Sequence, residues 1–174
     1  PGSSKDTMIN ACLVAAEINN MLPGLEIPRE TEDYEGFYHL TGMSGDVAQA
    51  KLHYIVRDHD KNLFEARKET LRHIEGTVKL MITDQYQNMA EIIAGCMHLI
   101  ENAKKACENV GVAPLVLPIR GGTDGCQLSF MGLPCPNLGT GGHAFHGPYE
   151  HITAEGMDKA VDIVVELVKL YAEM

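Results

Sequence analysis

The chain has 174 residues, of which 45% are hydrophobic, and this suits one ordinary domain or two small ones with a real core. With 14 Lys and Arg against 24 Asp and Glu the net charge is -10, and because the basic residues form no patch, nucleic acid is not an expected partner. No apolar run reaches the roughly 18 residues of a membrane span, and no secretion signal opens the chain, so neither membrane insertion nor secretion is expected. Five widely spaced cysteines without a CxxC pair indicate reduced thiols in a cytoplasmic protein.

A helix and a hairpin are predicted near the start of the chain. Apolar residues at roughly helical spacing predict a helix that opens at residues 3–6 and ends at Pro23. Residues 34–43 and 48–57 are typical of strands, and the turn residues 44–46 between them predict a β-hairpin. The period of two places three polar side chains on the face away from the core: Lys51, His53 and Arg57.

A second helix is predicted after Asp60, and residues 79–86 are predicted to form a strand. The resulting order is helix, strand, strand, helix, strand. It lacks only a leading strand to be a split βαβ, ferredoxin-like unit. We therefore expect a first domain of residues 1–87 with this α+β fold and its first strand missing.

Residues 88–174 are predicted to form a partial α/β domain, too small for a complete doubly wound sheet. The predicted helices are residues 90–109, a short one capped by Thr123 or Asp124 and ending at Phe130, and a last one that starts at Thr153. The predicted strands are residues 114–119 and 135–138.

Two glycine-rich loops carry the chemistry-bearing residues of this second half. Residues 118–125 read PIRGGTDG and hold Arg120, and residues 140–147 read TGGHAFHG and hold His143 and His146. Glycines of this density let the backbone approach a ligand closely or adopt positive φ, so both loops are predicted to belong to a site.

These two loops, together with LSFMGLPCPNL at residues 128–138, closely resemble the C-terminal third of the peptidase T family of cytoplasmic aminotripeptidases. Three earlier segments resemble the lid domain of that family: YEGFYHL, HYIVRD and FEAR at residues 34–40, 53–58 and 64–67. The resemblance covers essentially the whole chain. It implies a two-zinc exopeptidase that cleaves the N-terminal residue from short peptides, with an α/β catalytic domain and an inserted lid that often mediates dimerisation.

The resemblance also implies that this chain supplies few of the catalytic groups. In the family the bridging aspartate, one histidine, further carboxylate ligands and the glutamate general base precede the lid, so no catalytic residue is expected here. His146 matches the one zinc ligand retained, and its alternative is a hydrogen-bonded loop histidine. His143 is expected to be a wall residue or a partner of a ligand, and the other histidines show no metal-site spacing.

Three residues are expected to bind substrate. Arg120 offers a planar fork for the terminal carboxylate of a peptide, although a salt bridge to Asp124 or a contact with a helix C-terminus would also explain it. By resemblance Arg57 supplies a carboxylate contact from the lid, and its alternative is a solvated charge paired with Asp58 or Asp60. Asn88 matches a peptidase T position between the domains and either contacts substrate or satisfies turn backbone.

Two functions of different class therefore remain open. The first is a zinc aminotripeptidase, for which this chain supplies His146, Arg120 and Arg57. The second is a non-catalytic module that folds and forms a homodimer through the lid, where a missing strand leaves a sheet edge exposed. The expected cofactor of the complete enzyme is a pair of zinc ions.

Overall fold

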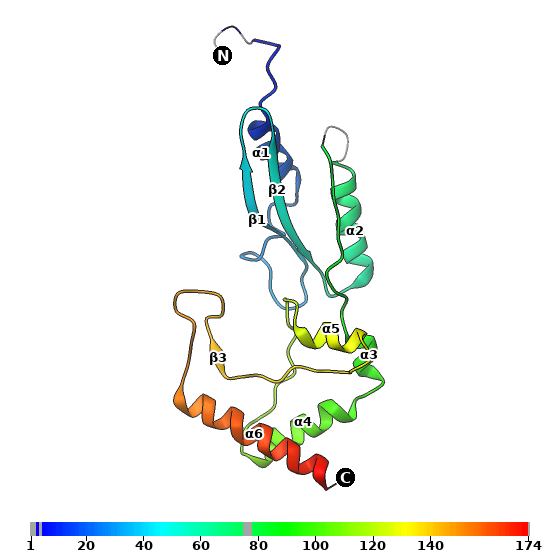
Figure 1. Ribbon diagram of the computed structural model, residues 1–174, viewed down its shortest axis with the longest axis vertical. Helices are drawn as coiled ribbons and strands as arrows, with labels where there is room; N and C mark the ends of the chain where they lie inside the picture. The colour runs from blue at the N-terminus through cyan, green and yellow to red at the C-terminus, as the bar shows by residue number, and fades with distance from the viewer. Residues whose placement is uncertain (1–2, 4, 75–77, 174) are drawn as a thin grey trace. The chain divides into compact units, whose positions relative to one another are not determined.

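The computed structural model describes residues 3, 5–74 and 78–173 (Figure 1). Contacts divide the chain into two compact units, which are described separately. Unit 1 comprises Pro1–Asp84 and Pro118–Gly121, and unit 2 comprises Gln85–Leu117 and Gly122–Met174. Part of the first glycine-rich loop, including Arg120, thus packs with unit 1.

Unit 1 begins with helix α1 (Ala11–Met21). The side chain of Asn10 accepts hydrogen bonds from the amides of Cys12 and Leu13 at 3.0 and 3.4 Å, and this cap sets the first turn. The prediction that the helix opens at residues 3–6 is wrong, because the described residues before Asn10 are not helical.

The predicted hairpin is confirmed as β1 (Phe37–Gly45) and β2 (Ala50–Arg57), which pair antiparallel with a bulge between Leu40 and Gly42. Lys51 and His53 are exposed as predicted. Arg57 is half-buried instead; it is the register partner of the buried Phe37 at the end of the hairpin opposite the turn.

The Asp46 carboxylate shapes the turn of this hairpin. Its Oδ1 accepts hydrogen bonds from the amides of Ala48 and Gln49 at 2.8 and 3.0 Å. The bond from Gln49, followed by the bond from Ala48, holds the pKa of Asp46 below its usual value. The first amide of α1, that of Ala11, donates to the Val47 carbonyl at 3.0 Å, so the turn is also attached to the helix.

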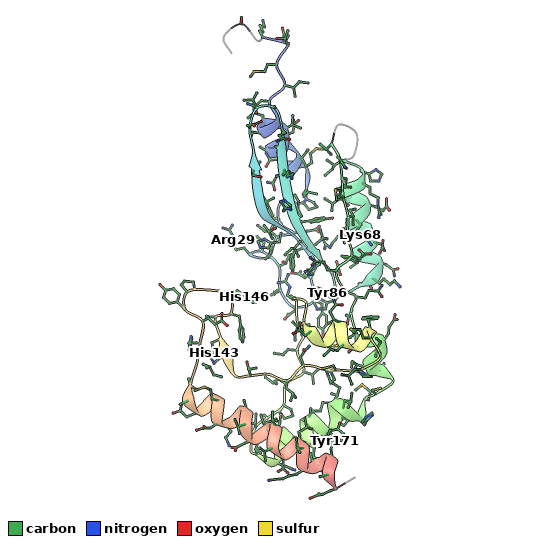
Figure 2. The ribbon with its side chains drawn as sticks, in the orientation of Figure 1. Arg29, Lys68, Tyr86, His143, His146 and Tyr171 are labelled. Atoms are coloured by element: carbon green, nitrogen blue, oxygen red, sulfur yellow. The ribbon has the colours of Figure 1, made fainter. Side chains whose placement is uncertain are left out.

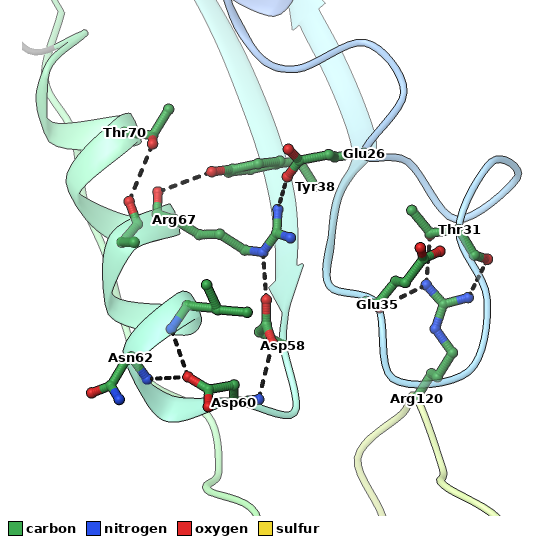
Figure 3. Close-up of polar contacts among 12 residues, drawn as sticks. Glu26, Thr31, Glu35, Tyr38, Asp58, Asp60, Asn62, Arg67, Thr70 and Arg120 are labelled. Atoms are coloured by element: carbon green, nitrogen blue, oxygen red, sulfur yellow. Dashed lines mark hydrogen bonds and ion pairs between the residues drawn. The ribbon is translucent and has the colours of Figure 1, made fainter.

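Helix α2 (Lys61–Arg72) starts at the predicted Asp60, whose carboxylate accepts from the amides of Asn62 and Leu63. From α2, Arg67 reaches a carboxylate at each of two other segments (Figure 3). Its Nε donates to Asp58 Oδ2 at 2.8 Å, and its Nη1 donates to Glu26 Oε2. Burial opposes the charge of Arg67, but the hydrogen bonds to Asp58 and Glu26 outweigh it and raise the pKa of the guanidinium.

Gly36 makes room for this ion pair. A Cβ on Gly36 would stand 2.2 Å from Asp58 Oδ2 and 2.5 Å from Arg67 Nε, so no other residue fits there without moving the pair. The Arg67 guanidinium also lies over the Tyr38 ring, 5.2 Å from its centre. The pair is therefore enclosed by β1 as well.

Lys68, also on α2, is a buried cation with a relative exposure of 6%. Its Nζ contacts Glu65 at 2.8 Å and Asp84 at 3.2 Å, and it lies 4.9 Å from the centre of the Phe64 ring. The hydrogen bond to Glu65 raises the pKa of Lys68 most; burial opposes it, and Asp84 adds to it.

The strand predicted at residues 79–86 is wrong. A strand needs a ladder of backbone hydrogen bonds with a neighbour, and in the described residues this segment has none and stays irregular. Asp84 instead meets Lys68 of α2. In the described part of unit 1 the ferredoxin-like pattern is thus a two-stranded sheet with two helices.

Unit 2 contains four helices among its described residues (Figure 1). They are α3 (Ala90–Ala94), α4 (His98–Asn109), α5 (Asp124–Phe130) and α6 (Ala154–Ala172). The single helix predicted at residues 90–109 is in fact two, separated at Gly95. Thr123 and Thr153 cap α5 and α6 as predicted, each accepting from an amide three residues on.

The strands predicted at residues 114–119 and 135–138 are also wrong. Residues 114–119 have no ladder partner in the described chain. The Cys135 amide donates to Ser129 Oγ of α5 at 3.0 Å instead of to a strand. Gly125 allows this approach, because a Cβ there would meet the Cys135 carbonyl oxygen at 2.4 Å.

Large apolar side chains of unit 2 remain exposed. Helix α6 has no buried residue, and Leu115, Val116 and Leu117 are 68–80% exposed. The helical spacing of apolar residues predicts a buried face of α6, but all its members are exposed: Met157, Val161, Val164, Val165 and Val168. Three of them, Val161, Val164 and Val165, line an open apolar hollow together with Ala160. These surfaces have the apolar composition of a protein interior, but they are exposed to solvent. In the described chain, no helix is both long and apolar enough to cross a membrane.

We predict that Arg67→Met destabilises unit 1 by about 3–5 kcal/mol, because the substitution leaves a buried carboxylate without its partner. The Asp58 side chain is only 1% exposed. Urea unfolding followed by circular dichroism measures the change.

Arg72→Met is the matched control on the same helix. Arg72 pairs with Glu69, and the two side chains are 42% and 59% exposed, so the expected change is below about 0.5 kcal/mol. Equal effects of the two substitutions would contradict the role assigned to the Arg67 pair.

Candidate functional site

The second glycine-rich loop forms a small hairpin in unit 2. Strands β3 (Gly142–His143) and β4 (His151–Ile152) pair antiparallel, with seven residues between them. Ala144 and His146 have positive φ, 54° and 63°, a conformation that costs non-glycine residues free energy and concentrates at functional sites. The His146 amide donates to Glu150 Oε2 at 3.0 Å, which helps to hold this turn.

His146 is exposed on this loop (Figure 2), as a ligand for an added group must be. Among the described residues no group of three or more His, Cys, Asp or Glu side chains is arranged to hold a metal ion. His146 thus stands in no complete metal centre within this part of the protein, and its role as a zinc ligand stays a prediction.

The β3–β4 ladder brings together two other histidines that the sequence pattern did not connect. His143 and His151 are register partners, and their rings stack with centres 5.4 Å apart and planes at 27°. Short-range spacing could not reveal the pair, because it depends on the hairpin that closes around residues 144–150. The available sequence signal for this hairpin was the glycine-rich segment between the two short strands.

Arg120, on the first glycine-rich loop, is held by a loop of unit 1 (Figure 3). Its Nη1 donates to the Thr31 carbonyl at 2.5 Å, and its Nη2 donates to Thr31 Oγ1 at 2.6 Å and to the Glu35 carbonyl at 3.1 Å. The guanidinium lies 4.9 Å from the centre of the Phe37 ring. Neither alternative considered from sequence, Asp124 or a helix C-terminus, is a partner among the described residues.

The Nε of Arg120 differs from its two Nη atoms. Nε is buried and has no hydrogen-bond partner among the described residues. The group therefore satisfies most of its donors within the fold but not all of them. Beyond it, Gly122 packs in unit 2, where a Cβ would stand 2.3 Å from the Tyr86 ring.

The two remaining candidates have local contacts. Arg57 ends β2, and its Nη1 donates to the Val56 carbonyl at 3.1 Å. The Asn88 Oδ1 accepts from the Ala90 amide at 2.9 Å, which is the turn-satisfying contact considered from sequence. Arg57 and Arg120 belong to unit 1, and Asn88 and His146 belong to unit 2.

The chain was compared with known proteins over its whole length. No family model matches the chain. Proteins named peptidase T match over 99% of it: that of Alkaliphilus oremlandii is 49% identical and that of Clostridium novyi 50% identical. The chain covers 44% and 45% of these two proteins, respectively, so it spans less than half the length of the curated relatives it matches.

Two crystal structures share the fold. A tripeptidase from Staphylococcus aureus has a TM-score of 0.71 at 16% identity, and 99% of this chain matches 48% of that one. Aminopeptidase PepT from Bacillus cereus has a TM-score of 0.61 at 19% identity, with coverage of 97% and 47%. The resemblance in the sequence motifs is thus confirmed: the chain is similar to proteins named peptidase T over 99% of its own length.

Proposed function

We propose that the chain comprises the lid domain, residues 1–87, and the C-terminal catalytic segment, residues 88–174, of a zinc-dependent aminotripeptidase. Such an enzyme removes the N-terminal residue from short peptides and works in the cytoplasm. The observation that carries this proposal is the identity of about half of all aligned residues to peptidase T across 99% of the chain. That span includes both glycine-rich loops.

The exposed apolar surfaces of unit 2 support the idea that the chain works as part of a larger protein. Helix α6 and residues 115–117 leave interior-type side chains uncovered, and the relatives are more than twice as long as this chain. We assign the missing cover to the part of peptidase T that this chain does not span.

The described residues do not by themselves fit a two-zinc centre. His146 belongs to no group of three or more metal-binding side chains in the described chain, and catalytic zinc sites take about three protein ligands. The proposal therefore places the other ligands and the general base in the part of the relatives outside the match. His146 is its one contribution to the metal from this chain.

Binding of the peptide is the role proposed for Arg120, Arg57 and Asn88. A guanidinium matches a carboxylate through two parallel hydrogen bonds. Arg120 Nε is buried and has no hydrogen-bond partner in residues 3, 5–74 and 78–173, whereas both Nη atoms donate to Thr31 or Glu35. A substrate carboxylate would use Nε and displace one Nη contact. The Asn88 oxygen accepts from the Ala90 amide, whereas its amide nitrogen has no hydrogen bond within the described part of the chain and is proposed to donate to a substrate carbonyl.

The test is completion of the enzyme. The part of the Clostridium novyi peptidase T outside the matched 45% is supplied to this chain as a fusion, and hydrolysis of a tripeptide and bound zinc are measured. We expect no hydrolysis by the chain alone, and hydrolysis with about two zinc ions per molecule in the fusion.

In this fusion His146→Gln should lower kcat by at least about a hundredfold and reduce the zinc content, because the metal loses a ligand, and removal of metal with a chelator should do the same. His73→Gln, on an exposed residue at the end of α2, is the matched control and should change neither quantity. A folded, zinc-loaded fusion without peptidase activity would refute the proposed function.

A second prediction concerns Arg120. In the fusion, Arg120→Met should raise KM for a tripeptide about 10–100-fold, since a charged hydrogen bond is lost, and should leave the C-terminally amidated tripeptide nearly unaffected. Arg29→Met, at a side chain that is 85% exposed in the same unit, should affect neither substrate. An equal rise in KM for both substrates would contradict carboxylate binding and would instead indicate that Arg120 stabilises the loop that contains Thr31 and Glu35.

The second candidate function is a non-catalytic module that dimerises through the lid. It is favoured by the β1–β2 sheet, which has two strands and therefore two outer edges unpaired among the described residues. Such edges pair readily with those of a second copy.

Light scattering of the chain should then give twice its mass of 19.0 kDa. Met43→Lys places a charge on β1 and should yield monomers, whereas Met21→Lys on α1 should not; both methionines are exposed. A monomeric wild-type chain, or a dimer indifferent to Met43→Lys, would contradict association through this sheet.

A further inference from the structure

His143 and His151 face each other across the β3–β4 ladder. They are direct register partners, both are exposed, and their ring centres are 5.4 Å apart. Side chains at directly opposed positions of an antiparallel pair are the ones that interact most closely. The β3–β4 ladder therefore holds two imidazoles close together.

The hydrogen bond of His151 determines which of its nitrogens can bind a ligand. Nδ1 lies 2.7 Å from the Tyr149 carbonyl oxygen, which can only accept, so Nδ1 carries the proton. In the neutral ring Nε2 is then an unprotonated acceptor. A histidine that binds a metal through one nitrogen typically donates the other N–H to a carbonyl or carboxylate in this way.

The separation of the rings suits one shared ion. At a Zn–N distance of about 2.0–2.1 Å, the metal lies about 3.2 Å from the centre of each ring, so two rings that share an ion have centres up to about 6 Å apart. The observed 5.4 Å is within this limit. His151 can keep its hydrogen bond to Tyr149 while rotation about the side-chain bonds of the exposed His143 brings one of its nitrogens onto the ion.

We propose that His143 and His151 form a binding site for a divalent transition-metal ion of the kind that prefers imidazole, such as Zn²⁺, with water as the remaining ligands. Imidazole suits zinc, copper and nickel, whereas magnesium and calcium prefer oxygen. The site is separate from the role proposed for His146, which lies in the turn between the two strands and has a different backbone partner, Glu150.

The test is a zinc titration of the metal-free 174-residue chain, followed by calorimetry and by NMR of the histidine ring protons. Wild-type protein should bind one Zn²⁺ with the ring signals of His143 and His151 shifting together. His143→Gln and His151→Gln should each weaken binding at least about tenfold, because the second imidazole acts at a high effective concentration only when both are present.

His98→Gln, at an exposed histidine that opens α4 in the same unit, is the matched control and should change the affinity less than about twofold. Circular dichroism of all variants should match the wild type, because the three side chains are exposed. Binding that survives both His143→Gln and His151→Gln, or that is lost in His98→Gln, would overturn the proposal. Neither result depends on peptidase activity, so failure of the proposed function would leave this test unaffected.

Discussion

The buried ion pair of Arg67 with Asp58 holds unit 1 together. Arg67 belongs to α2, Asp58 follows β2, and Glu26 belongs to the loop before β1, so one guanidinium joins three segments that share no backbone ladder. Gly36 keeps the chain close enough for this to occur. The loop that Glu26 and Gly36 anchor at its two ends is the one whose Thr31 and Glu35 bind Arg120. The loop that holds Arg120, the residue proposed to bind substrate, is thus anchored by the contacts of Arg67.

Unit 2 is organised differently, through side chains that cap helix ends and turns. Thr123 and Thr153 start α5 and α6, Ser129 receives the Cys135 amide, and Glu150 receives the amide of His146. These contacts build local structure, but they cover little apolar surface. A unit with exposed valines along α6 gains stability only when another surface covers them, which agrees with relatives more than twice as long.

The β3–β4 hairpin concentrates histidine chemistry in a short segment. His146 is placed in the turn with a left-handed backbone, while His143 and His151 are placed opposite each other on the strands. The same loop can therefore present one imidazole to a metal centre completed by other residues and two imidazoles to an ion of their own. The difference lies in backbone position, since all three rings are exposed.

The sequence by itself determined what depends on near neighbours. Helix caps at Asp60, Thr123 and Thr153 and the β1–β2 hairpin were predicted, because their hydrogen bonds join residues a few positions apart, and the motifs of the two glycine-rich loops identified the peptidase T homologue. Only the tertiary structure decided the rest. Residues 79–86 and 114–119 have strand-like composition, yet a strand requires a partner that the described chain does not supply. The contact of Arg67 with Glu26 and those of Arg120 join residues distant in sequence, and no local pattern encodes them. The pairing of His143 with His151 depends on the register of the β3–β4 hairpin, which their spacing alone does not give.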